Sequence, residues 1–171
     1  MSNEILHKQI VEKFNSIFSD PPPEVPDYVV DNLGHKLRPY QEHALSQFIF
    51  TQEIDQADLY SNHLLFHMAT GSGKTLVLAS NILYLYKEQN KQNFIFFVNS
   101  DAIIKKTKDN LINRNSLKYL FRKEGIVIDG NYIDIQIVDV FPSLPAPYTI
   151  YLKLTTIQKL HSDLTEPKEN S

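Results

Sequence analysis

The sequence predicts a three-layer α/β domain in which helices cover both faces of a parallel β-sheet. Two patterns lead to this fold class. Short apolar runs typical of buried strands alternate with longer segments typical of helices. A glycine-rich turn at 71–73 joins one apolar run directly to an apolar helix. A chain of 171 residues, 42% of them hydrophobic, is large enough to bury the core of such a domain.

Two segments precede the predicted sheet. Residues 3–18 place apolar side chains at the spacing of an amphipathic helix. Residues 19–26 contain four prolines, which favour an extended linker or a segment lying on a surface. We therefore divide the chain into an N-terminal helix with a proline-rich linker, residues 1–30, and a main domain, residues 31–171.

The main domain is expected to begin with a helix that starts at Pro39, because proline suits the first helical turn. An apolar strand at 63–69 should then lead through the glycine-rich turn into a helix that ends near residue 88. Residues 94–98 form a second apolar run, of the kind buried on both faces of a parallel sheet. The remaining expected elements are helices over 101–112 and 116–123 and strands over 133–140 and 149–154.

Composition excludes several classes of protein. The formal net charge of −3 gives no overall basic field, although a local basic track can still bind nucleic acid. The absence of cysteine excludes a disulfide framework and any cysteine-ligated zinc or iron–sulfur site. No apolar run approaches the roughly 18 residues of a membrane span, and the first residues lack the apolar core of a signal peptide. We therefore expect a cytoplasmic protein without membrane contact.

The most specific motif is Ala69-Thr70-Gly71-Ser72-Gly73-Lys74-Thr75, here called the phosphate loop. Its glycines let backbone N–H groups point into one concavity, and the following helix N-terminus adds a partial positive charge. Lys74 supplies an ammonium group for phosphate oxygens, and the Thr75 hydroxyl is a ligand for Mg²⁺. The loop therefore predicts a nucleoside triphosphate site, although Met68 stands where the strict pattern has its first glycine. The predicted binding residues here are Thr70, Gly71, Ser72, Gly73, Lys74 and Thr75.

The phosphate loop also resembles the first motif of superfamily 2 helicases and translocases. Upstream, Leu37-Arg38-Pro39-Tyr40-Gln41 is similar to the adenine-reading region of that superfamily, in the form found in restriction translocases. The resemblance implies that Gln41 reads adenine, with Arg38 or Tyr40 packed against the base. The chemistry is suitable, because an amide both donates and accepts and because arginine and aromatic groups pack on bases. The alternative is that Pro39 merely begins a helix with Tyr40 in the core and Gln41 in solvent.

Two weaker similarities concern DNA. Residues 97–100 and the helix after them resemble the superfamily motif that touches the DNA backbone. Residues 150–160 are similar to the strand and turn that precede the acidic motif in restriction translocases. Hydroxyls, amides and lysines suit phosphate oxygens, but ordinary solvated strand-to-helix junctions have the same composition. The candidate DNA contacts are Asn99, Ser100, Lys105, Thr107, Thr155, Thr156 and Gln158.

Taken together, residues 37–160 resemble the first part of a type III restriction enzyme Res subunit. The resemblance implies a RecA-like P-loop NTPase lobe, here incomplete, with ATP and Mg²⁺ as cofactors. It also implies duplex DNA as the substrate and a methyltransferase, or modification, subunit as a partner. In that family, two RecA-like lobes close on ATP to drive movement along DNA, and a downstream nuclease domain cuts it.

One element of the family pattern is missing. Such ATPases need an apolar strand that ends in Asp-Glu, which holds Mg²⁺ and positions the attacking water. No Asp-Glu pair occurs in the chain, and the nearest imitation ends at Asp139 followed by Val140. We therefore expect residues 31–171 to end before this motif and the isolated chain to bind ATP without hydrolysing it. A stand-alone nucleotide-binding remnant and a small P-loop kinase remain as alternatives.

Overall fold

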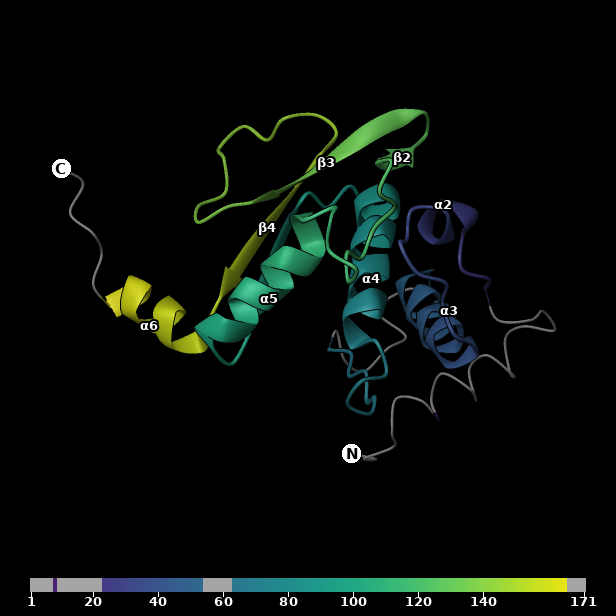
Figure 1. Cartoon of the computed structure of the whole chain (residues 1–171), viewed down its shortest axis with the longest axis horizontal. Coiled ribbons are helices and arrows are strands. Elements are labelled where there is room, and N and C mark those ends of the chain that lie inside the picture. Colours follow the sequence, from purple (N-terminus) through teal and green to yellow (C-terminus); the bar gives the residue numbers. More distant parts are fainter. Residues whose placement is uncertain (1–7, 9–22, 54–62, 166–171) are drawn as a thin grey trace.

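The computed structural model describes residues 8, 23–53 and 63–165. Within them, four strands form one sheet in the order β1-β4-β3-β2 (Figure 1). The strands β1 (Asn93–Phe97), β4 (Thr149–Thr155) and β3 (Asn131–Ile137) are parallel, and β2 (Ile126–Ile128) pairs antiparallel with β3. The helix predicted over 3–18 and the start of the proline-rich linker lie outside the described residues.

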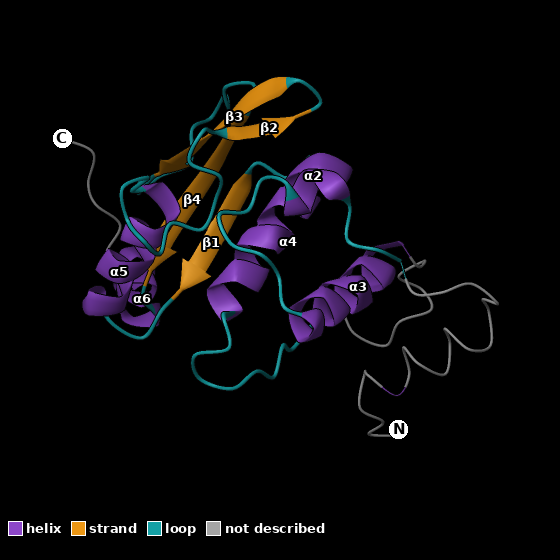
Figure 2. Ribbon diagram, turned by 45° about the vertical axis from the view of Figure 1, so that its right-hand side comes forward, coloured by secondary structure: helices purple, strands orange, loops and turns teal. Residues whose placement is uncertain are grey.

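Helices cover the sheet. Figure 2 shows α5 on one side of the strands and α4, with α2 and α3 beyond it, on the other. This mixed fold with a mostly parallel sheet confirms the predicted class. No described helix has the length and apolar character needed to cross a membrane. The helices are α2 (Asp27–Val30), α3 (Pro39–Glu53), α4 (Lys74–Gln89), α5 (Asp101–Ile112) and α6 (Ile157–Thr165).

The core lies where α4 meets the sheet. The central strand β4 buries Ile150 and Leu152 completely, and α4 buries Ala79 and Leu83 completely. This burial explains why α4 is apolar along most of its length, since the helix is packed on more than one side. The core fixes the N-terminal end of α4, and with it the phosphate loop, relative to the strands.

The predicted strand at 63–69 is not formed. Along this segment Leu64, Phe66 and Met68 are half-buried against the core, whereas Leu65 and its neighbours at 63 and 67 are exposed. This alternation is typical of a strand. A strand also needs a hydrogen-bonded neighbour, and in the described part of the chain β1 pairs only with β4.

The predicted helix at 116–123 is wrong. Residues 119–121 are all buried, and three consecutive side chains cannot share one face of a helix. Their backbone groups bond elsewhere, because Leu120 N–H donates to the Asn110 carbonyl at 2.9 Å and Phe121 forms a bridge with Leu33. Strand β2 was missed, although the Asp129-Gly130 turn that follows it is a strong hairpin signal.

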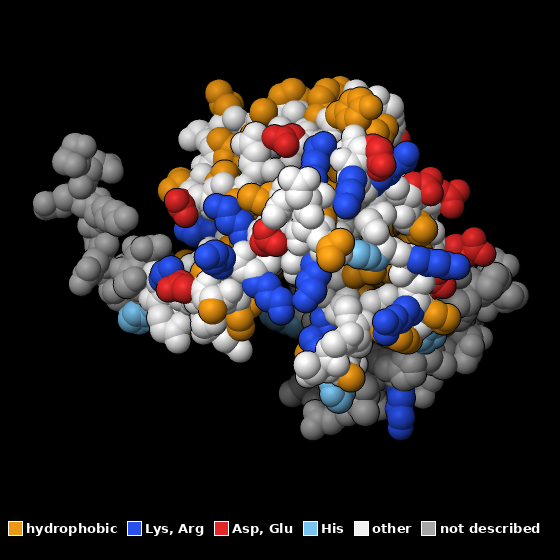
Figure 3. Space-filling view, in the orientation of Figure 1, with side chains coloured by type: hydrophobic (Ala, Val, Ile, Leu, Met, Phe, Trp, Pro, Cys, Tyr) orange, Lys and Arg blue, Asp and Glu red, His pale blue; other side chains and the backbone are white. Residues whose placement is uncertain are grey.

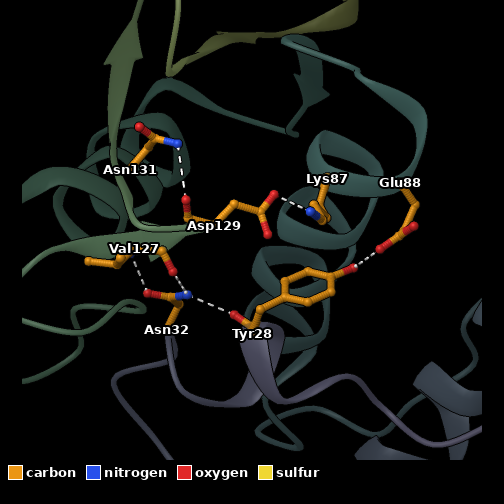
Figure 4. A network of polar contacts seen from close by, with 7 residues as sticks. All are labelled: Tyr28, Asn32, Lys87, Glu88, Val127, Asp129 and Asn131. Atoms are coloured by element: carbon orange, nitrogen blue, oxygen red, sulfur yellow. Dashed lines mark hydrogen bonds and ion pairs between the residues drawn. The ribbon is translucent and has the colours of Figure 1, made fainter.

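The connection between α2 and α3, residues 31–38, is held against the connection between α5 and β2, residues 113–125. The amide of Asn32 donates to the Val127 carbonyl and accepts from the Val127 N–H, both at 2.7 Å, as a neighbouring strand would (Figure 4). Lys87 on α4 forms an ion pair with Asp129 in the same region. The Asn32 bonds therefore hold the α2–α3 connection to β2, and the Lys87–Asp129 pair holds α4 to the turn after β2.

Candidate nucleotide-binding site

The phosphate loop forms a turn at the N-terminal end of α4. Gly71 and Gly73 have φ angles of 79° and 81°, which a glycine adopts without steric cost. Gly73 caps α4, and its carbonyl accepts from the Leu76 N–H at 2.9 Å. A methyl group at Gly71 would meet no atom within 4 Å, so the space beside that residue is open. Both glycines of the loop therefore have the backbone conformation that favours glycine, and open space lies beside Gly71.

Lys74 and Thr75 differ in where their side chains lie. The Lys74 ammonium donates to the carbonyls of Met68 and Ala69, at 3.1 and 2.9 Å. The half-buried Thr75 lines the cavity beside the loop. Thr70 is exposed and does not line the cavity. Thr75 therefore already lies at the cavity, whereas the Lys74 ammonium would have to leave two carbonyls in order to bind a phosphate group.

Two side chains from the first turn of α3 brace the loop. The Ser72 carbonyl accepts hydrogen bonds from the Tyr40 hydroxyl at 2.8 Å and from the Gln41 amide at 2.9 Å. The Gln41 amide oxygen accepts from the Arg38 N–H at 2.8 Å, and the Arg38 guanidinium donates to the Tyr40 hydroxyl at 3.2 Å. Gln41 is only 2% exposed. The three residues predicted upstream thus lie together at the loop, and Gln41 is not in solvent.

These elements line an open cavity of about 460 Å³. Among the predicted nucleotide-binding residues, Arg38, Gln41, Gly71, Ser72, Gly73 and Thr75 line it, whereas Tyr40, Thr70 and Lys74 do not. A volume of this size suits a small organic ligand. The lining also includes residues that no sequence motif predicted, namely His35, Lys36, Leu76, Asn110, Lys118 and Leu120.

The charge around the cavity has one sign. Lys36, Arg38 and Lys118 line it, and among the residues that the structure describes no Asp or Glu side chain does. This contrasts with the whole chain, whose formal net charge is −3. Figure 3 shows lysine and arginine side chains gathered around the middle of the face drawn there. Such a cavity raises the local concentration of an anionic ligand.

The candidate DNA contacts lie near the C-terminal ends of the parallel strands β1 and β4. Strands β1 and β4 are paired in register, with Phe97 opposite Thr155, so the segments that follow them lie side by side. Thr155 and Thr156 are buried. The Thr155 hydroxyl donates to the Thr156 carbonyl, and the Thr156 hydroxyl accepts from the Lys159 N–H. Thr107 is half-buried. The exposed candidates are Asn99, Ser100, Lys105 and Gln158.

Carboxylates are not gathered at this site. Asp139 is exposed in a bend after β3, which β4 separates from β1. It does not line the cavity beside the phosphate loop. Among the described residues, no group of three or more histidine, aspartate or glutamate side chains is placed to hold a metal ion. Thr75 therefore remains the predicted protein ligand to Mg²⁺.

Comparison with known proteins agrees with this geometry. The family model described as "Type III restriction enzyme, res subunit" matches residues 34–171. The probable type III restriction-modification enzyme HindVIP Res subunit of Haemophilus influenzae is 38% identical over 152 residues, which are 85% of this chain and 29% of that protein. The type I restriction enzyme EcoAI endonuclease subunit of Escherichia coli is 33% identical over 84 residues, 49% of this chain and 10% of that protein. No solved structure matches significantly.

Proposed function

The chain belongs to the type III restriction enzyme Res subunit family, and we propose that it binds ATP and Mg²⁺ as the front part of a motor lobe that acts on duplex DNA. The family consists of ATPases and helicases of restriction systems. The observation that supports ATP binding most directly is the phosphate loop at the head of α4, braced by Tyr40 and Gln41 beside a cationic cavity.

The residues present fit a nucleoside triphosphate. The open space at Gly71 and the start of α4 suit phosphate oxygens, which a helix N-terminus attracts. Lys74 reaches the phosphates by rotating its flexible stem away from the Met68 and Ala69 carbonyls. Thr75 supplies a hydroxyl for Mg²⁺, which neutralises charge on the phosphates when bound.

Gln41 is the proposed adenine reader, and the structure gives it a second task at the same time. Its amide nitrogen is directed to the carbonyls of Ser72 and Gly73, at 2.9 and 3.4 Å. The Gln41 amide oxygen has two lone pairs, and one of them accepts from the Arg38 backbone N–H. The second lone pair can accept from the exocyclic amine of adenine. Base recognition and loop position are then coupled through one side chain.

Action on DNA and assembly with a modification subunit are proposals for the longer protein. The chain spans less than a third of the Haemophilus relative that it matches. Exposed Asn99, Ser100, Lys105 and Gln158 at the edge of β1 and β4 are the proposed backbone contacts. Translocation, DNA cleavage and a cytoplasmic location follow from the same proposal. Family membership argues against a small P-loop kinase, whereas a non-catalytic nucleotide-binding remnant remains compatible with the site.

The proposal is tested by binding of a fluorescent ATP analogue to the wild-type chain and to Lys74→Ala. We expect binding by the wild type and none by the variant, because the substitution removes the ammonium group nearest the loop. Lys91→Ala, which changes an exposed lysine outside the cavity, should bind like the wild type. Equal affinities of wild type and Lys74→Ala would contradict the phosphate-loop assignment.

A further inference from the structure

The cavity beside the phosphate loop has a second wall. It consists of His35, Lys36 and Arg38 from the α2–α3 connection and Lys118 and Leu120 from the α5–β2 connection. Apart from Arg38, none of these residues belongs to a predicted ligand-binding motif, and the two connections are distant in sequence. Their meeting at the cavity is therefore a property of the fold.

The second wall is built rigidly. Gly34 N–H donates to the Leu120 carbonyl at 2.8 Å, and Arg122 N–H donates to the Asn32 carbonyl at 2.9 Å. The contact is so close that a methyl group at Gly34 would lie 2.5 Å from the Phe121 carbonyl oxygen. This bonding fixes the backbones of both connections relative to each other. It therefore also fixes the Cα positions of Lys36 and Lys118.

Lys36 and Lys118 are the cations of this wall that remain available. Arg38 is engaged with the Tyr40 hydroxyl, whereas neither lysine ammonium has a partner among the described residues. Within the described ranges of the chain, no carboxylate lines the cavity to neutralise them. Both lysines line the same cavity, so an anion bound there is attracted by two ammonium groups.

We propose that Lys36 and Lys118 form a cationic clamp that binds the phosphate groups of the nucleotide from the wall facing the phosphate loop. This rests on the proposed function, since the ligand is the same triphosphate. The clamp offers ammonium groups to the phosphates while the Lys74 ammonium is bonded to the Met68 and Ala69 carbonyls. It makes affinity depend on the number of phosphate groups as well as on the base.

The experiment compares Lys36→Met, Lys118→Met and the double variant with Lys123→Met. Methionine keeps the length of the apolar stem of lysine and removes the ammonium group. Lys123 is exposed on the same α5–β2 connection but does not line the cavity, so the control changes net charge equally. We expect each single variant to weaken binding of an ATP analogue about fivefold and the double variant more, with Lys123→Met unchanged. The loss should shrink from ATP to AMP and vanish for adenosine.

A double Lys→Arg variant at positions 36 and 118 should retain affinity, and thermal unfolding checks that every variant is folded. If the wild type binds ATP but the double Met variant binds as tightly as Lys123→Met, the clamp is overturned and the proposed function stands. An equal loss for ATP and adenosine also overturns the clamp, because the lysines would then act on the base or the fold. If the wild type binds no ATP at all, the proposed function itself fails.

Discussion

The side-chain amide of Gln41 donates to the Ser72 carbonyl at 2.9 Å and thereby joins the first turn of α3 to the phosphate loop. The same carbonyl accepts from Tyr40, the preceding residue of the helix. The loop is thus held by two neighbouring side chains of one helix. A residue expected to read adenine is therefore also a structural support of the phosphate site, and its substitution should affect both.

Gln41→Glu should weaken ATP binding about tenfold and reduce the preference for ATP over GTP. A carboxylate cannot donate to the Ser72 carbonyl, and its burial beside carbonyl oxygens is unfavourable. Titration with fluorescent ATP and GTP analogues measures both effects. Gln136→Glu, on the exposed face of β3, is the matched control. Weakened binding with unchanged selectivity would remove the adenine-reading role and leave the brace; unchanged affinity would remove the brace as well.

Alanine at the two loop glycines should have unequal effects on stability. Both residues have positive φ, so either substitution costs about 1 kcal/mol in backbone strain. At Gly73 the added methyl group would also collide with the Gln41 amide, whereas at Gly71 it meets no atom within 4 Å. Denaturant unfolding should therefore show Gly73→Ala to be the less stable variant. In a Gln41→Ala background the difference should disappear, and its persistence would refute the steric explanation.

Gly34→Ala should destabilise the protein by about 2 kcal/mol or more. Its methyl group would lie 2.5 Å from the Phe121 carbonyl oxygen and 2.8 Å from that of Tyr119, and neither backbone atom moves easily. Gly130→Ala is the control, since it meets no atom within 4 Å and costs strain alone at φ 77°. Thermal unfolding of the two variants measures the difference. Equal midpoints would mean that the two connections are less tightly packed than described.

The sequence predicted best the elements whose signals are local. The phosphate loop, the helix beginning at Pro39 and the helix over 101–112 each depend on neighbouring residues, and the structure has all of them. The strand at 63–69 depends on a partner strand, which no local pattern supplies. The segment 116–123 was misassigned because its buried residues pack and bond to the distant residues 32–34.

The site shows the same division. The residues of the phosphate loop and Gln41 belong to short motifs and were expected. Lys36 and Lys118 reach the cavity only because Gly34 allows two connections to meet. In Thr155 and Thr156, the chemistry suited a DNA contact, but burial directs both hydroxyls to internal bonds. Residue type could not reveal which side chains the fold leaves exposed.

Stability should fall as the pH rises from about 10 to 12. Burial first, and then the charges of Glu53 and Glu88, raise the pKa of Tyr84 to about 12. The pKa of Tyr28 is raised by burial and by its hydrogen bond to Glu88. An unfolded tyrosine ionises near pH 10, so above that pH the unfolded state releases protons that the folded state retains, and the free energy of unfolding decreases.

Tyr84→Phe tests this explanation, because phenylalanine cannot ionise. Its free energy of unfolding, measured by denaturant titration between pH 8 and 12, should fall less steeply with pH than that of the wild type. The control is Tyr132→Phe, since Tyr132 is 73% exposed. Its pH dependence should equal that of the wild type. Identical slopes for Tyr84→Phe and wild type would show that other groups cause the alkaline unfolding.

The isolated chain should show no DNA-stimulated ATP hydrolysis above the level of Lys74→Ala. Attack on the terminal phosphate needs a carboxylate to position water and a second group to hold Mg²⁺ beside Thr75. In the described part of the chain no carboxylate lines the cavity. Asp139 follows β3, and β4 lies between β3 and β1 in the sheet. Phosphate release with and without duplex DNA measures the activity. Turnover that Asp139→Asn abolishes would assign the missing role to Asp139, and turnover that survives this change would place it on another carboxylate.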